Sequence, residues 1–152
     1  MHASYAIALT AALACCWIGL VLGVSFLATV AKFRAPGLTL PVALEVGRHT
    51  FLWLARAEWA LAIALATSIL LSGLPPLRTA AFAIITAILL AQAFWLLPAL
   101  DARVTAIIGG GTPAPSSLHL YFIVCETAKL ALLLFIAAAA FRALTPPGAT
   151  AG

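Results

Sequence analysis

The sequence has few charged side chains. Only 8% of its 152 residues are Asp, Glu, Lys or Arg, whereas a soluble domain usually carries about a quarter. At the same time 65% of the residues are hydrophobic, and a small globule cannot hide that many from water. This composition excludes a soluble domain. It predicts a single integral membrane domain over residues 1–152, because lipid solvates apolar side chains.

Sequence motifs of common catalytic and cofactor sites are missing too. The chain contains no HExxH, no CxxC and no CxxCH, and its three cysteines are not placed for an intrachain disulfide. The glycine run at residues 109–111 lacks the lysine and the strand-to-helix context of a phosphate-binding loop. The sequence therefore gives no support for an enzyme, and it leaves any metal or cofactor unknown.

The formal net charge of +4 comes from basic residues scattered one or two per loop, without a basic run or an interleaved aromatic stripe. This distribution argues against binding of nucleic acid. It is typical of residues that contact lipid headgroups and set the orientation of membrane helices. The lipid bilayer is therefore the first partner that the sequence predicts.

Four hydrophobic segments are long enough to cross a bilayer as helices. A helix rises 1.5 Å per residue, so about 20 residues cross a hydrocarbon layer of about 30 Å. The segments run over about residues 5–30, 50–71, 77–97 and 118–141. Pro98 is expected to end the third segment. We predict an all-α fold: a polytopic membrane protein built as a four-helix transmembrane bundle.

The predicted segments alternate in direction, so the links between the first two and between the last two lie on one membrane face. That face carries more basic residues than the other, which has Arg78 and Arg142. The positive-inside rule places the more basic face in the cytoplasm and both termini outside. The residues of the basic face are Lys32, Arg34, Arg48 and Arg103.

Gly19 and Gly23 form a GxxxG pair in the first segment. Glycines four residues apart lie on one face of a helix and allow another backbone to approach closely. We predict a helix-packing face here. The pattern leaves open whether the partner helix belongs to the same chain or to a second copy in a homo-oligomer.

Polar side chains recur at a similar depth in the predicted bundle. Glu126 lies seven residues after His119, roughly 10 Å deeper, and Lys129 is about one turn further. Ionisable groups at that depth cost free energy unless they face a partner or water. The expected intramembrane cluster consists of Arg56, Glu58, Gln92, Glu126 and Lys129.

Two interpretations of this cluster follow. The first is structural, because buried ion pairs fix the orientation of helices while adding little net stability. The second is a pocket open to the cytoplasm that binds a small polar solute, a metal ion or a proton. In the second, Glu126 is the titrating or liganding group, with Lys129 and Arg56 as its counter-charges, and Glu58 points elsewhere on its helix.

His49, His119 and Asp101 lie near the predicted cytoplasmic ends of the segments. They are candidate ligands of a haem or a metal, although a single histidine at a helix end is more often an interfacial residue. A haem- or quinone-binding redox protein is therefore a third functional alternative. The second functional alternative, beside the polar-solute pocket, is an accessory subunit of a larger membrane complex with purely structural ion pairs.

Three short patterns together resemble a bacterial group of small four-span membrane proteins of unknown function. The resemblance implies the four-span architecture and a bacterial inner membrane, and it transfers no catalytic residue. The patterns are Trp17-x-Gly19-x3-Gly23 with Phe26, Pro98-x-Leu100-Asp101-x-Arg103, and Leu118-His119-x-Tyr121-x4-Glu126-x2-Lys129.

Overall fold

The computed structural model describes residues 2–73 and 75–145, and the regular secondary structure of these residues is entirely helical. The predicted all-α fold is therefore confirmed. In chain order the elements are α1 (His2–Val21), the π-helix η1 (Leu22–Ala28), α2 (Thr29–Arg34), α3 (Leu40–Leu71), α4 (Pro76–Ala91), the π-helix η2 (Gln92–Leu96), α5 (Leu97–Ile108) and α6 (Leu118–Leu144).

These elements join into four long helices, which we call the first to fourth spans. All four are long and apolar enough to cross a membrane, so the chain is a multi-pass membrane protein. Their 27–33 residues correspond to about 40–50 Å, which is more than the hydrocarbon thickness. The helix ends therefore reach into the headgroup region. The spans are Ala3–Arg34, Leu40–Leu71, Pro76–Ile108 and Leu118–Leu144.

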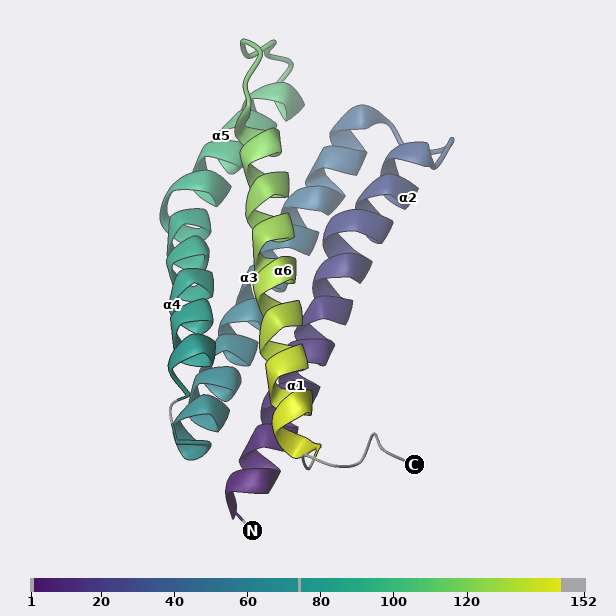
Figure 1. Cartoon of the computed structure of the whole chain (residues 1–152). Helices are drawn as coiled ribbons and strands as arrows, with labels where there is room; N and C mark the ends of the chain where they lie inside the picture. Colours follow the sequence, from purple (N-terminus) through teal and green to yellow (C-terminus); the bar gives the residue numbers. More distant parts are fainter. Residues whose placement is uncertain (1, 74, 146–152) are drawn as a thin grey trace.

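The four spans alternate in direction (Figure 1). The α2–α3 and α5–α6 connections lie at one end of the bundle, which we call the loop end. The α3–α4 turn lies at the other end, near the start of α1 and the end of α6 (Figure 1). Helix α6 packs against α1 and α4, and α1 also packs against α3. These two connections therefore lie at the same end of the bundle, as the alternation predicted.

The interior of the bundle is a cluster of buried apolar side chains to which every span contributes. Trp17, Leu65, Ile85 and Leu133 are each fully buried there. The outer surface is equally apolar, with residues such as Phe94 exposed. Since lipid solvates leucine as well as a protein core does, helix association depends on close packing and on polar contacts between helices.

The third span continues past the residue that was expected to end it. Pro98 lies in the first turn of α5, which runs on to Ile108. Proline inside a helix removes one backbone hydrogen bond, and the π-helix η2 that ends at Leu96, just before it, is the kind of local adjustment by which membrane helices accommodate proline. The prediction that Pro98 closes the span was wrong, and Asp101 and Arg103 therefore lie on a helix.

Adjacent residues Ile84 and Ile85 provide a matched test of this packing. Ile85 is fully buried, whereas Ile84 is 52% exposed on the outer surface. Ile85→Ala should lower the free energy of unfolding by about 2 kcal/mol or more, because it leaves a cavity in the core. Ile84→Ala should change it by less than about 0.5 kcal/mol. Unfolding by titration with a denaturing detergent measures both, and equal effects would contradict the helix orientation.

Candidate functional site

Lys129 lies at the centre of a buried polar cluster. Its side chain is completely buried, and its Nζ lies 2.5 Å from Glu58 Oε1 and 2.7 Å from Glu126 Oε1. One ammonium group is therefore shared by two carboxylates from different helices, α3 and α6. The approach of Glu126 and Lys129 follows from their spacing of three residues on one helix.

Glu126 receives hydrogen bonds from two further spans. Ser25 donates its hydroxyl to Glu126 Oε2 at 2.7 Å, and Gln92 donates through Nε2 to Glu126 Oε1 at 2.8 Å. Glu126 itself is 1% exposed and Gln92 3%. Both oxygens of this carboxylate are thus hydrogen-bonded, as a charge removed from water requires.

Glu58 is held from the first span by Trp17. The indole Nε1–H donates to Glu58 Oε1 at 3.0 Å, and both side chains are buried. The sequence interpretation missed Trp17 as part of the cluster. A general rule points to it, because a buried tryptophan N–H usually finds an acceptor. We use the name buried cluster for Trp17, Ser25, Glu58, Gln92, Glu126 and Lys129.

Two members of the buried cluster lie in the two π-helical segments. Ser25 is in the middle of η1, and Gln92 begins η2. A π turn adds a residue to the helical turn and displaces the side chains that follow, and such turns are frequent at functional sites. Neither π segment was predicted from the sequence, because periodicity alone does not show a single widened turn.

The structure does not bring Arg56 into the cluster. Arg56 is exposed, and its guanidinium lies 4.7 Å from the centre of the Trp53 ring on the same helix. Residues two positions apart on a helix differ in direction by about 200°, so Arg56 and Glu58 face nearly opposite ways. Glu58 therefore points into the bundle, and Arg56 points away from it.

Because Arg56 lies outside the cluster, it does not contribute to the cluster's charge. Two carboxylates and one ammonium leave a formal charge of −1 when all three groups are ionised. With Arg56 included, the cluster expected from the sequence would sum to zero. A buried unit charge is costly in a low-dielectric medium, so binding of one proton or one monovalent cation would balance the cluster.

The other candidate ligands lie outside the cluster. His49 is exposed on α3. Asp101 is exposed on α5 and pairs with Arg48, whose Nε lies 2.5 Å from Asp101 Oδ1. His119 is exposed at the start of α6 but lines a cavity that reaches Glu126.

This cavity has a volume of about 190 Å³, and we call it the Glu126 cavity. It is lined by residues of the first, second and fourth spans, from the halves of these helices nearer to the α2–α3 and α5–α6 connections. Its polar lining comes from Ser25, Thr29, His119 and Glu126, and the rest is apolar. The apolar lining residues are Phe26, Val30, Phe51, Phe122 and Ile123.

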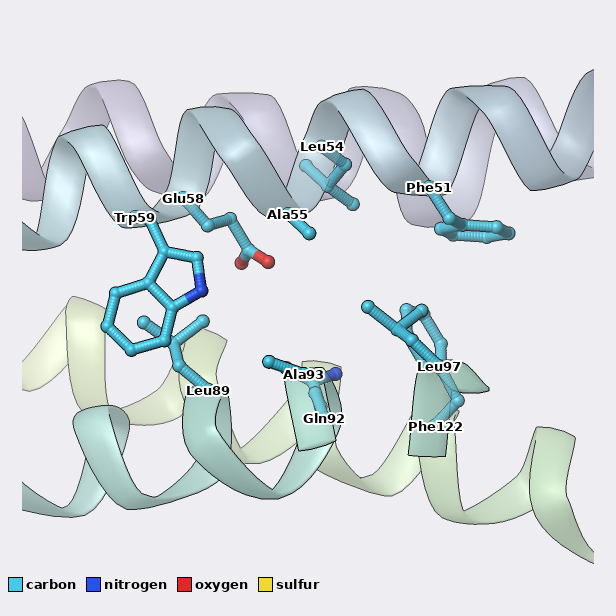
Figure 2. A pocket seen from close by; sticks show the side chains of 10 residues that line it. All are labelled: Phe51, Leu54, Ala55, Glu58, Trp59, Leu89, Gln92, Ala93, Leu97 and Phe122. Carbon is cyan, nitrogen blue, oxygen red and sulfur yellow. The ribbon is translucent and has the colours of Figure 1, made fainter. Parts of the chain in front are cut away.

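A second, much smaller cavity has a volume of about 10 Å³, and Glu58 and Gln92 are its polar lining residues. Figure 2 shows the Glu58 carboxylate projecting from α3 toward the helix that carries Gln92. Gln92 Oε1 is buried and has no hydrogen-bond partner among the described residues. The space suits a single water molecule, which would have Gln92 and Glu58 as polar neighbours.

Gly19 and Gly23 do not pack closely within the described part of this chain. A Cβ atom added at either glycine would meet no other atom within 4 Å. The close approach of another helix that the GxxxG pattern predicts is thus not made here. The surface at these glycines is left for lipid or for another chain.

Comparisons with protein families, with curated protein sequences and with solved structures found no match to this chain. The chemistry of the site therefore has to be argued from its own residues.

Lys129→Met tests the energetic role of the shared ammonium. It leaves two carboxylates buried without a counter-charge, so the free energy of unfolding should fall by about 3–5 kcal/mol. Adding Glu58→Gln should restore part of that loss, because one negative charge is removed. Unfolding by a denaturing detergent gives the values.

Arg56→Met is the matched control, since it removes a cation from the same region of the bundle. It should leave the unfolding midpoint unchanged, because Arg56 is exposed and makes no ion pair with the described residues. A loss as large as that of Lys129→Met would contradict the position assigned to Arg56.

Proposed function

We propose that this protein handles a proton or a small cation through the buried cluster, with Glu126 as the exchanging group. One observation carries the proposal: a single Lys129 ammonium is shared by two buried carboxylates, and one of them, Glu126, also lines the Glu126 cavity. With all three groups ionised, the cluster carries a charge of −1, which attracts a positive charge to the carboxylate that lines the cavity.

The geometry supports exchange at Glu126 rather than at Glu58. Glu58 faces the cavity of about 10 Å³, whereas Glu126 faces the one of about 190 Å³. When a proton or cation reaches Glu126, Lys129 still has Glu58 at 2.5 Å as a partner. The ammonium therefore never loses both carboxylates, which keeps the cost of the exchanged state low.

The proposed setting is a bacterial inner membrane, with the Glu126 cavity open toward the cytoplasm. Four spans give little room for alternating access within one chain, so a transport function requires a homo-oligomer. The unoccupied surface at Gly19 and Gly23 supplies a face where a second copy can approach. Native mass spectrometry from a mild detergent measures the number of copies.

An accessory subunit of a larger membrane complex is the second candidate. The observation that favours it is the nearly complete hydrogen bonding of Lys129, Glu126 and Glu58, which is what a purely structural cluster needs. A redox role stays a further alternative. His119 lines the Glu126 cavity and could serve as one ligand there, whereas His49 does not line it. A visible absorption band of the purified protein tests for haem.

Proton flux into proteoliposomes tests the proposed function. Vesicles that contain the protein and an entrapped pH dye should acidify faster than protein-free vesicles when a membrane potential is imposed. Glu126→Gln should reduce the rate to that of protein-free vesicles, because an amide does not exchange a proton. The control Glu45→Gln changes an exposed carboxylate on α3 and should leave the rate unchanged.

If the Glu126→Gln variant acidified the vesicles at the wild-type rate, Glu126 would not be the exchanging group. Rates no faster than those of protein-free vesicles, with the wild-type fold intact, would refute proton handling and, if the protein binds no small cation either, would favour the accessory subunit.

A further inference from the structure

The polar groups of the Glu126 cavity are mainly hydrogen-bond acceptors. Ser25 uses its hydroxyl proton on Glu126 Oε2, at 2.7 Å, and Thr29 uses its own on the backbone carbonyl of Val24, at 3.3 Å. Each hydroxyl oxygen therefore has lone pairs, but no proton, left for a ligand. Together with the carboxylate of Glu126, this lining favours a ligand that donates hydrogen bonds or carries positive charge.

Aromatic rings form much of the remaining wall. Phe26, Phe51 and Phe122 line the cavity, and the Phe51 and Phe122 rings meet edge to face at 4.9 Å between centroids. The faces of phenyl rings attract cations, and their apolar surface suits methyl and methylene groups. This wall therefore accepts a cation that carries carbon atoms.

Lys32 shows that an ammonium group is accommodated next to this wall. It follows Thr29 by three residues, and its Nζ lies 4.7 Å from the centre of the Phe33 ring and 5.9 Å from that of Phe51. Gly47 makes this position possible, because a Cβ there would lie 2.4 Å from Lys32 Nζ. A ligand cation in the cavity would meet the same kind of ring, with Glu126 in addition.

We propose that the Glu126 cavity binds a small organic ammonium ion, with Glu126 as its counter-charge and the phenyl rings around its carbon atoms. This assignment names the substrate class of the proposed function and rests on it. The volume of about 190 Å³ is below the range of about 300–1,000 Å³ typical of drug-sized ligands, so the ion has few heavy atoms. A bare Ca²⁺ fits the wall less well, because it takes six to eight oxygen ligands.

Calorimetric titration of the purified protein in a mild detergent tests the assignment. The probes are choline and its uncharged isostere 3,3-dimethylbutan-1-ol, with sodium chloride at the same ionic strength as the reference. Choline should bind saturably with one site per chain, and the alcohol and the sodium salt should show no saturable heat. Equal binding of choline and the alcohol would overturn the proposal, and so would no binding of either.

Phe51→Leu tests the wall without touching the charges. It keeps an apolar side chain but removes the ring face, so choline affinity should fall about fivefold. The control Phe141→Leu alters an exposed ring on α6 outside the cavity and should leave the affinity unchanged. Lys32→Gln should tighten choline binding, because it removes a like charge near the cavity. Unchanged affinity in both Phe51→Leu and Lys32→Gln would refute this site.

Each of the two proposals can be refuted without refuting the other. Proteoliposomes that conduct protons, with a protein that binds no choline, would overturn the ammonium assignment and leave the proposed function standing. Choline binding that Phe51→Leu weakens, in a protein without proton flux, would support the site and refute proton handling.

Discussion

The arrangement of the bundle depends on one ammonium group held between two carboxylates. Lys129 approaches Glu58 and Glu126 from the fourth span, and every other span supplies a donor to these carboxylates or one of the carboxylates themselves. Because lipid offers no water to satisfy these groups, separating the spans would leave charges without partners. The cluster therefore sets how the four helices are rotated toward one another, while the apolar core supplies close packing.

The same cluster fits a structural role and, in the proposed function, a chemical one. Buried ion pairs fix orientation more reliably than they add stability, and the hydrogen bonds from Trp17, Ser25 and Gln92 fit that role. A purely structural cluster, however, needs neither an excess negative charge nor a cavity at one of its carboxylates. The larger cavity sets Glu126 apart from Glu58, and together with the charge of the whole cluster it is the basis of the proposed exchange.

The structure brings four of the five residues of the expected cluster together and leaves the fifth outside. Counting about 1.5 Å per residue placed Glu58, Gln92, Glu126 and Lys129 at a similar level, and the structure brings these four together. The same count included Arg56, which faces outward. The sequence placed Arg56 and Glu58 on different faces of their helix, but a largely apolar helix carries no periodic signal that shows which face is turned toward the bundle.

The sequence by itself determined the membrane location, the number of spans and their alternating direction, because these follow from composition, segment length and short connections. Only the tertiary structure decided the rotation of each helix, and with it the partners of Lys129, the role of Trp17 and the cavity beside Glu126. It also decided that the third span continues through Pro98 and that two turns widen into π-helices. These features arise from contacts between residues far apart in the chain, which local spacing does not encode.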